Sequence, residues 1–149
     1  FVELNFKPIS VNISQTEKRN EYSLLSRCKT FSYFQSILAL TEANKNNFDD
    51  ALMLNTKNEL CCGTTFNLLL KRKDIWLTPR KESGCLPGIM VNQLLKLQKA
   101  KEDYLLPIFQ EDDILIAVNS MTCRQIKQVG NLKFKTNYDT NYFWEMLYI

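Results

Sequence analysis

The sequence contains no histidine among its 149 residues. Histidine is the commonest general base near neutral pH and the commonest zinc ligand in proteins. Its absence excludes every Ser–His and Cys–His nucleophile pair. Any chemistry must therefore use lysine, cysteine, tyrosine, threonine or carboxylate groups.

Paired cysteine motifs and long apolar segments are also lacking. The five cysteines are an odd number without a CxxC spacing (Cys28, Cys61, Cys62, Cys85 and Cys123), and in a strand the adjacent pair is expected to point to opposite faces. The longest apolar stretches fall far short of the ~20 residues of a membrane span, and no signal-peptide pattern opens the chain. We therefore expect reduced thiols, no bound metal and a cytoplasmic protein.

The sequence also has only a small excess of charge of one sign. Nineteen basic and 16 acidic residues give a net charge of +3, which is too small and too evenly spread to indicate a nucleic acid or an anionic membrane as a partner. The chain does have 45% hydrophobic residues and a length that can bury a large core. These values predict one folded domain over residues 1–149 and exclude a disordered chain.

Apolar periodicity predicts alternating strands and helices. Residues 1–6 alternate like a strand that the chain enters at its first residue, so we expect a part of a longer protein. The polar residues 8–27 predict a surface loop with at most a helical turn. Helical spacing predicts a helix from residue 31 to a stop at 45–47, a second over 89–101 and a closing helix over 142–147. Short apolar runs predict strands at 50–55, 59–70, 74–78, 105–109, 114–119 and 132–135. This order indicates one α/β domain with a mixed sheet.

Three stretches carry residues that local structure alone does not require. Residues 29–33 place Lys29 before an apolar helix, although a solvated surface residue is the commoner explanation of a single lysine. Residues 61–67 interrupt an apolar strand with Gly, Thr and Asn, which a β-bulge also explains. Residues 84–90 form a glycine-bounded turn that enters a helix. The unpaired N–H groups of such a terminus suit a phosphate, but the turn could equally be a simple loop.

In this order and spacing, the three stretches resemble the large domain of the class IV, fold-type IV pyridoxal-phosphate enzymes. The resemblance extends over residues 49–55, 76–79 and 119–120. This family includes 4-amino-4-deoxychorismate lyase, branched-chain aminotransferase and D-amino-acid aminotransferase. The resemblance implies the large C-terminal domain of the D-amino-acid aminotransferase-like fold, an α/β fold with a mixed sheet or pseudo-barrel and flanking helices. It also implies pyridoxal 5'-phosphate as the cofactor.

The resemblance implies a role for residues around the cofactor ring. Lys29 matches the lysine that forms a Schiff base with the cofactor aldehyde and, once released, moves protons at the substrate carbon. Leu86 matches the aliphatic residue beneath the ring. Thr65 and Asn67 match the polar groups that the cofactor-side strand turns toward the ring.

The resemblance also implies where the phosphate binds. The backbone amides of Ile89 and Met90 match contacts at a helix terminus, where N–H groups point at an anion. Asn119 and Ser120 match a second phosphate-binding turn.

Several positions depart from the family pattern. Cys62 stands where a glutamate normally pairs with the pyridine nitrogen, and Glu59 is expected to lie on the other face of the strand. A neutral thiol is a weak hydrogen-bond partner, and loss of one charge-assisted contact costs roughly 1.5–3 kcal/mol. Val91 replaces an arginine and Ile126 replaces a proline. Nothing corresponds to the family's smaller N-terminal domain, so we expect a fragment of a longer protein or a degenerate relative.

Residues 61–62, 78–80 and 88–90 look most like the lyase branch. The resemblance thus implies a lyase that converts the small molecule 4-amino-4-deoxychorismate to 4-aminobenzoate and pyruvate in folate biosynthesis. A class IV aminotransferase of the branched-chain or D-amino-acid type is the alternative enzyme, and an inactive truncated homologue is a third possibility. The family also implies a homodimer when full-length, in which the tail at 142–148 packs against a partner subunit or within its own core.

Overall fold

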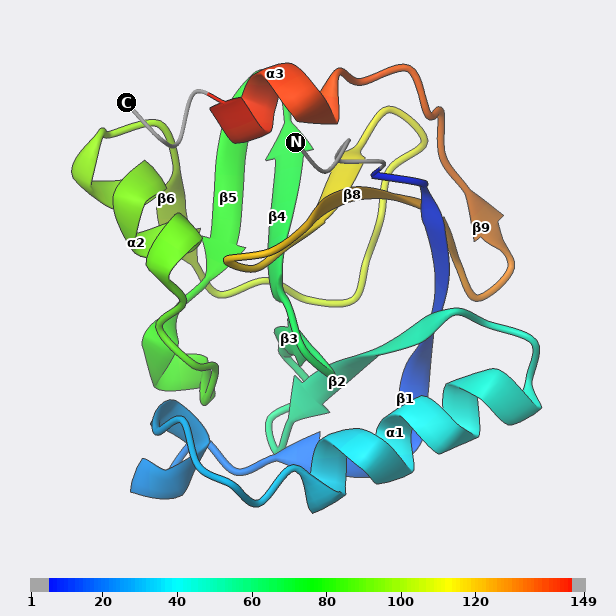
Figure 1. Cartoon of the computed structure of the whole chain (residues 1–149), viewed down its shortest axis with the longest axis vertical. Helices are drawn as coiled ribbons and strands as arrows, with labels where there is room; N and C mark the ends of the chain where they lie inside the picture. The colour runs from blue at the N-terminus through cyan, green and yellow to red at the C-terminus, as the bar shows by residue number, and fades with distance from the viewer. Residues whose placement is uncertain (1–5, 146–149) are drawn as a thin grey trace.

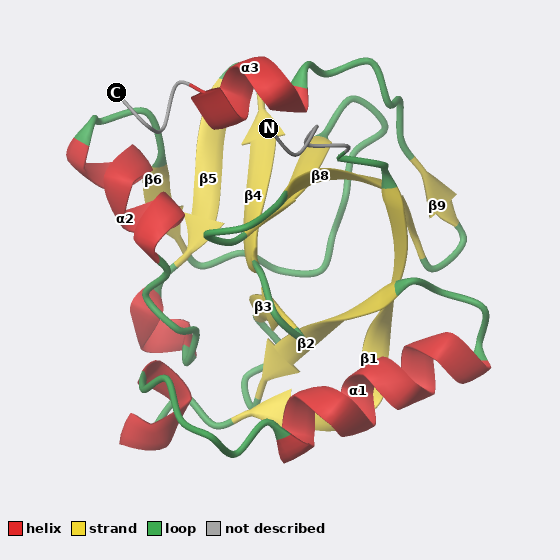
Figure 2. Cartoon of the chain, viewed as in Figure 1, coloured by secondary structure: helices red, strands yellow, loops and turns green. Residues whose placement is uncertain are grey.

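A computed structural model describes residues 6–145, and nine strands within this range form one curled sheet (Figure 1). The strands are β1 (Ile9–Arg19), β2 (Asp50–Asn55), β3 (Leu60–Gly63), β4 (Asn67–Arg72), β5 (Ile75–Pro79), β6 (Lys101–Asp103), β7 (Ile114–Val118), β8 (Cys123–Val129) and β9 (Leu132–Lys133). The helices are α1 (Phe34–Lys45), α2 (Ile89–Lys96) and α3 (Thr140–Glu145), with 3₁₀ turns at Leu24–Arg27 and Lys81–Ser83 (Figure 2). The predicted α/β class is therefore confirmed.

The sheet is mixed, as predicted. Its strand order is β3-β2-β1-β8-β7-β4-β5-β6, with β9 beside β8. Strand β1 runs parallel to both β2 and β8, and β5 runs parallel to β6. Parallel neighbours need a crossover connection, and α1 supplies it between β1 and β2 while α2 supplies it between β5 and β6.

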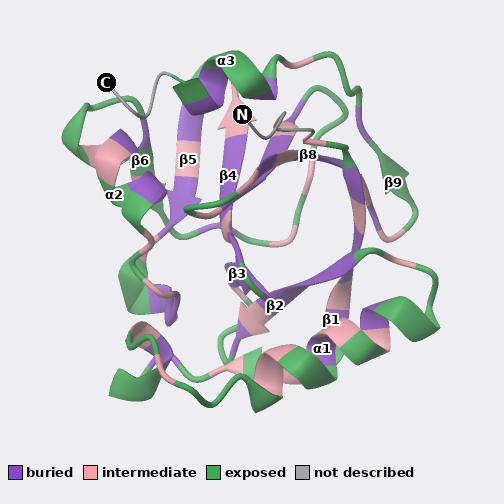
Figure 3. Ribbon diagram, in the orientation of Figure 1, coloured by how far each residue is buried: buried purple, intermediate pink, exposed green. Residues whose placement is uncertain are grey.

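Three apolar clusters hold the sheet and helices together (Figure 3). The largest lies inside the curl of the sheet and includes Val11, Leu52 and Leu115. A second lies between the strands and helices α2 and α3, where the tilted rings of Trp76 and Phe143 contact each other at a centroid distance of 5.0 Å. The third joins α1 to β2 and β3. The helices therefore cover the outer faces of the sheet, and the interior of the curl is filled by side chains.

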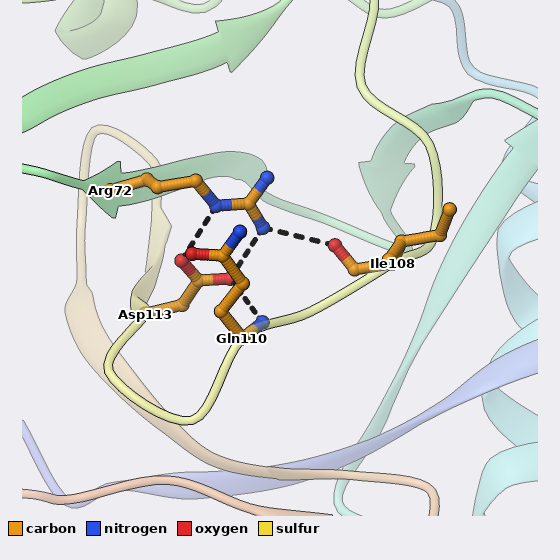
Figure 4. A network of polar contacts seen from close by, with 4 residues as sticks. All are labelled: Arg72, Ile108, Gln110 and Asp113. Carbon is orange, nitrogen blue, oxygen red and sulfur yellow. Dashed lines mark hydrogen bonds and ion pairs between the residues drawn. The ribbon is translucent and has the colours of Figure 1, made fainter.

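An ion pair fixes β4 at the end opposite Asn67 (Figure 4). The Arg72 guanidinium donates to both carboxylate oxygens of Asp113 at 2.9 and 2.6 Å and to the Ile108 carbonyl at 3.0 Å. The Gln110 backbone N–H donates to the same carboxylate at 2.8 Å. Asp113 is buried, so this network ties the irregular segment before β7 to the central strand.

The predicted surface loop over residues 8–27 is wrong for residues 9–19, which form β1 between β2 and β8. It is confirmed for residues 20–27, which contain no strand and one short 3₁₀ turn at Leu24–Arg27. Ile9 and Val11 are buried in the interior cluster. The polar residues that suggested a loop are bound by one carboxylate on α1. Ser14 Oγ donates to Glu42 at 2.6 Å, and the Gln15 N–H donates to Glu42 at 2.8 Å. When only the sequence is considered, a strand rich in polar residues is easily predicted as a loop, because the partners that bind those residues lie elsewhere in the fold.

Helix boundaries also differ from the prediction. The first helix begins at Phe34 rather than at residue 31 and turns Ala39 and Ala43 toward the sheet, whereas Phe31 and Ile37 are exposed. The second helix ends at Lys96 instead of 101. The third spans Thr140–Glu145, and residues 146–147 of the predicted closing helix lie outside the described residues, as do residues 1–5 of the predicted opening strand.

The predicted strands are confirmed in part. The strands at 50–55, 74–78, 114–119 and 132–135 correspond to β2, β5, β7 and a shorter β9. The predicted strand over 59–70 is broken at 64–66, where the chain bends between β3 and β4. Residues 105–109 contain no strand, and β6 and β8 were not predicted. The bend proves to be the most consequential difference, because it forms one wall of the cavity described below.

Candidate functional site

One cavity of about 910 Å³ lies where the end of β1, the bend between β3 and β4 and the entrance to α2 meet. Its lining comes from segments far apart in the sequence, within residues 19–36, 53–67, 86–89 and 119–121. The described lining residues include Arg19 and Lys29 but no aspartate or glutamate. The cavity therefore presents a positive surface that suits an anionic ligand.

Lys29 lies in the segment between the first 3₁₀ turn and α1. It lines the cavity together with Gly88 and Ile89, so the lysine and the glycine-bounded turn meet at one site. Its side chain is exposed in this chain. The cavity is therefore open on the lysine side rather than enclosed.

The bend between β3 and β4 is joined to the turn before α2. Asn67 Nδ2 donates to the Leu86 carbonyl at 2.8 Å. A Cβ on Gly88 would overlap Asn67 Oδ1, so only glycine allows the turn to approach this closely. Asn67, Leu86 and the neighbouring Thr65 all line the cavity.

Helix α2 begins beside the cavity without a side-chain cap. Its N-cap is Gly88, whose carbonyl accepts from the Asn92 N–H at 2.9 Å. The N–H groups at the start of a helix have no partner within the helix, so the uncapped first turn can bind an anion. Ile89 lines the cavity, whereas the side chain of Met90 is buried in the cluster beneath α2. Only the backbone N–H of Met90 can therefore contact a ligand in the cavity.

A second turn follows β7 on the other side of the cavity. Asn119 Oδ1 accepts from the backbone N–H groups of Met121 and Thr122 at 2.8 and 2.9 Å. Its Nδ2 donates to the Thr65 carbonyl at 3.1 Å. The Asn119 side chain therefore closes this turn and ties it to the bend. Both Asn119 and Ser120 line the cavity.

Cys62 lies in the wall of the cavity and is buried. It belongs to one apolar cluster with the neighbouring Cys61 and with Cys85. The expectation that the adjacent cysteines point to opposite faces is therefore wrong. The pairing register of β2 and β3 shifts between Met53 and Leu54, and this irregularity interrupts the alternation that a regular strand would impose.

Arg19 is a site residue that the sequence analysis missed. Its guanidinium donates to the Ser26 carbonyl at 2.8 Å, to Gln35 Oε1 at 3.2 Å and to the Gly84 carbonyl at 3.4 Å. These contacts fasten the end of β1 to the segments that carry Lys29 and Leu86. The predicted loop over 8–27 concealed this residue, and the alternation of Ile9, Val11 and Ile13 is the pattern that could have revealed its strand.

Asp50 lies behind Thr64, which lines the cavity. Its Oδ1 accepts from Thr64 Oγ1 at 2.6 Å and from the Ala51 N–H at 2.7 Å. Burial raises the pKa of Asp50 above its usual value despite these bonds. The carboxyl group therefore orients Thr64 in the cavity wall.

Residues 3–129 match the family described as "Amino-transferase class IV", and the chain belongs to this family. The cofactor of the family is pyridoxal phosphate, and one matched structure is a holo form that contains it. The predicted family, fold type and cofactor are thus confirmed at this level.

Several relatives have the same fold. The "Putative 4-amino-4-deoxychorismate lyase" of Legionella pneumophila has a TM-score of 0.84 at 24% identity over 97% of this chain and 58% of that chain. The branched-chain aminotransferase of Thermobaculum terrenum in its pyridoxal-phosphate form has a TM-score of 0.83 at 22% identity, over 95% of this chain and 51% of that chain. At these identities the likeness shows the fold alone.

A sequence relative covers part of the chain. The "Probable branched-chain-amino-acid aminotransferase" of Synechocystis sp. is 31% identical over 90 residues, which are 60% of this chain and 30% of that protein. The chain therefore spans about a third of the length of this relative and just over half of the matched solved chains.

Residues 6–145 contain neither a candidate membrane span nor a metal-binding cluster. No helix in this range has the length and apolar character needed to cross a bilayer. Over the same residues, no group of three or more Cys, Asp or Glu side chains is arranged to hold a metal ion.

Proposed function

We propose that the full-length protein is a pyridoxal-phosphate-dependent lyase that converts 4-amino-4-deoxychorismate to 4-aminobenzoate and pyruvate, a step of folate biosynthesis. The observation that carries the proposal is the meeting of Lys29, the first turn of α2 and the Asn119–Ser120 turn around one cavity. A lysine amine and oriented phosphate-binding groups are the parts that this cofactor requires. A substrate with two carboxylates also suits a lining that holds Arg19 and Lys29 and, within the described residues, no acid.

The residues of the cavity fit the cofactor. Its volume of about 910 Å³ lies within the range of roughly 300–1,000 Å³ that is usual for small-molecule sites. Glycine at position 88 lets the turn before α2 lie directly against Asn67, because a Cβ there would overlap Asn67 Oδ1. The uncapped start of α2 leaves backbone N–H groups for a phosphate, and the lack of acidic lining residues avoids repulsion of its charge.

When bound, the cofactor supplies an aldehyde and a ring that withdraws electrons from the substrate. The Lys29 amine would hold it covalently and, after release, take a proton from the substrate carbon that carries the amino group. The same amine would return a proton as pyruvate leaves. Backbone N–H groups of Ile89 and Met90, with the Asn119–Ser120 turn, would bind and orient the phosphate.

Other residues of the wall would position the ring. Leu86 would pack against one face of it, since Asn67 holds the Leu86 backbone at 2.8 Å. Thr65 lies in the same bend, where Asn119 fixes its carbonyl at 3.1 Å. Cys62 would face the ring nitrogen in place of the family's glutamate. A sulfur that remains neutral binds a ring nitrogen weakly, so the charge of Cys62 affects how strongly the ring withdraws electrons.

A class IV aminotransferase is the second candidate. The observation that favours it is the sequence match to branched-chain aminotransferases of Synechocystis and Aquifex aeolicus, at 31% and 30% identity. Both reactions begin with the same proton abstraction by Lys29. They differ in their products, because only transamination needs a keto acid to accept the amino group.

The experiment that separates the candidates uses the full-length gene product loaded with pyridoxal phosphate. It is supplied with 4-amino-4-deoxychorismate and no keto acid, and 4-aminobenzoate and pyruvate are measured. A second sample receives a branched-chain or D-amino acid with 2-oxoglutarate. We expect products in the first sample and none in a Lys29→Ala control. Products only in the second sample would establish the aminotransferase, and none in either would indicate an inactive homologue.

We also propose a homodimer in the cytoplasm. Exposed apolar side chains line the cavity, among them Leu25, Ile89 and Met121. Apolar surface of this kind indicates contact with another protein surface.

The cysteines are all free, which agrees with a reducing compartment. Light scattering of the full-length gene product is expected to give twice the mass of one chain.

A further inference from the structure

A second cavity lies away from the proposed cofactor site. Its volume of about 510 Å³ is within the range of roughly 300–1,000 Å³ that is usual for small-molecule sites. It is surrounded by the middle of β1, the end of α1 and the hairpin of β8 and β9, which lie on the right of Figure 1, whereas the entrance to α2 lies on the left. None of its described lining residues also lines the first cavity. The two cavities are therefore separate candidate sites.

Asn12 on β1 brings an unused hydrogen-bond acceptor to the second cavity. The residue lines this cavity and is only 8% exposed. Its side-chain Oδ1 is buried and has no hydrogen-bond partner. Most buried polar groups in native proteins are paired, because an unpaired acceptor gives up its bonds to water without replacement. A ligand that donates an N–H to Asn12 would supply the missing bond.

Glu42 on α1 gives the same cavity a negative charge. It is the only charged residue among the lining residues that the structure describes. Burial alone would raise the pKa of Glu42, but hydrogen bonds from β1 lower it below its ordinary value, so the group is a carboxylate near neutral pH. Oε1 accepts one of these bonds, from the Gln15 N–H at 2.8 Å. A carboxylate oxygen has about two acceptor positions, so Oε1 can accept a further donor. The cavity therefore favours a cation over an anion.

Apolar side chains supply most of the remaining wall. Phe48 and Phe109 are half-buried at the cavity, as are Ile13 and Pro107. The apolar body of a ligand would displace water from these surfaces. A free amino acid is disfavoured, because its carboxylate would face Glu42 without a basic residue in the described lining to neutralise it. The wall therefore suits an amine that carries an apolar group and no carboxylate.

We propose that this cavity binds a small organic ammonium ion, whose N–H donates to Asn12 Oδ1 beside the Glu42 carboxylate and whose aromatic or aliphatic body packs against Phe48 and Phe109. The binding is non-covalent. It uses none of the residues assigned to the cofactor, so it is tested independently of the proposed enzymatic activity.

The test compares three probes of similar shape by NMR titration of the full-length gene product. Protonated N,N-dimethylbenzylamine has a positive charge and one N–H. Benzyltrimethylammonium keeps the charge without an N–H, and benzyl alcohol keeps a donor without the charge. None of the three forms an imine with the aldehyde of pyridoxal phosphate, so the cofactor can stay in place. We expect the first probe to bind about tenfold more tightly than either of the others, because hydrogen bonds from charged donors are the stronger kind.

Variants identify the groups that bind the probe. Asn12→Leu removes the acceptor with little change in side-chain size and should weaken binding of N,N-dimethylbenzylamine by about tenfold. This variant should unfold at the same temperature as the wild type or a higher one, since it removes a buried acceptor that has no partner. Asn44→Leu is the matched control, because Asn44 is exposed on α1 and does not line the cavity. Glu42→Gln should weaken both cationic probes and leave benzyl alcohol unchanged.

Three results would overturn the inference. One is the absence of binding by N,N-dimethylbenzylamine, which is also the result expected if another part of the full-length protein or a second copy covers the cavity. Another is equal affinity for N,N-dimethylbenzylamine and benzyltrimethylammonium, because the N–H would then contribute nothing. The third is an affinity that Asn12→Leu leaves unchanged, because the probe would then bind elsewhere.

Discussion

At the scale of single residues, the close contact between Gly88 and Asn67 is the most restrictive feature of the cavity. Because a Cβ at position 88 would overlap Asn67 Oδ1, Gly88→Ala must displace the asparagine or the turn. Overpacking of this kind costs about 1–3 kcal/mol. We expect the variant to bind pyridoxal phosphate at least about fivefold more weakly, as measured by titration of the cofactor absorbance.

A double-mutant cycle checks the cause of that loss. In Asn67→Ala, the atom that Gly88→Ala would strike is absent, so the second substitution should cost much less there than in the wild type. Equal costs in the two backgrounds would show that the overlap with Asn67 does not control binding.

Individual site residues differed in how far the sequence could predict them. Lys29, Asn67 and Asn119 were found through family resemblance, since each is an ordinary polar residue when its local sequence is considered alone. Arg19 was missed, because its position on the cavity wall depends on pairing between strands distant in the sequence. The contact between Cys61 and Cys62 depends on a shift of register that residue types do not encode.

At the scale of elements, the Glu42 carboxylate on α1 binds three polar residues of β1, Ser14, Gln15 and Thr16. Burial alone would raise the pKa of Glu42, but hydrogen bonds from Gln15, Ser14 and Thr16 outweigh it and lower the pKa below its ordinary value of 4.5. A lowered pKa in the folded state stabilises the fold above the pKa of the unfolded chain. That contribution is lost as the pH falls through the folded-state value.

Glu42→Gln tests this attachment. Near neutral pH the variant should lose about 1–2 kcal/mol of unfolding free energy, because the amide cannot accept all the bonds of the carboxylate. The difference from wild type should shrink as the pH falls below about 4.5 and through the lowered folded-state pKa of Glu42, as measured by urea denaturation. Exposed Glu111 provides a control, since Glu111→Gln should change neither value. A difference independent of pH would contradict the role of the Glu42 charge.

The ion pair at the far end of β4 supports a second prediction about stability. Asp113→Asn leaves the half-buried Arg72 guanidinium without its charged partner. Breaking a fully buried pair costs about 3–5 kcal/mol, and because water reaches Arg72 we expect the smaller loss of a hydrogen bond to a charged group, about 1.5–3 kcal/mol. Urea denaturation should show a loss of this size. Asp74→Asn removes the carboxylate from an exposed pair with Lys71 at 3.1 Å and should cost no more than about 1 kcal/mol. Similar losses of unfolding free energy in both variants would show that the burial of Asp113 does not determine the strength of its ion pair.

Elements with strong local patterns were the ones that the sequence predicted. The apolar runs of β2 and β7 and the amphipathic α2 could be located within a few residues. The polar half of β1 was not recognised, because Ser14 and Thr16 are stabilised by hydrogen bonds to Glu42. Glu42 lies 28 residues from Ser14 and 26 from Thr16 in the sequence. β6 and β8 depend on neighbouring strands in the same way.

At the scale of the whole molecule, function depends on the meeting of distant segments. Lys29, the entrance to α2 and the turn after β7 come together only because β1 and β7 both pair with β8. Periodicity predicted a mixed α/β domain but not this arrangement. The positive lining of the cavity follows from the same topology, since Arg19 is the last residue of β1 and Lys29 lies in the segment that follows this strand.

The most direct test of the account is the attachment of pyridoxal phosphate to Lys29. The protein is mixed with the cofactor, reduced with borohydride, and digested for peptide mapping by mass spectrometry. We predict one stable adduct on Lys29, preceded by a new absorbance band that is absent in Lys29→Ala. No band at saturating cofactor, or an adduct spread over surface lysines with Lys29 unmodified, would contradict the account.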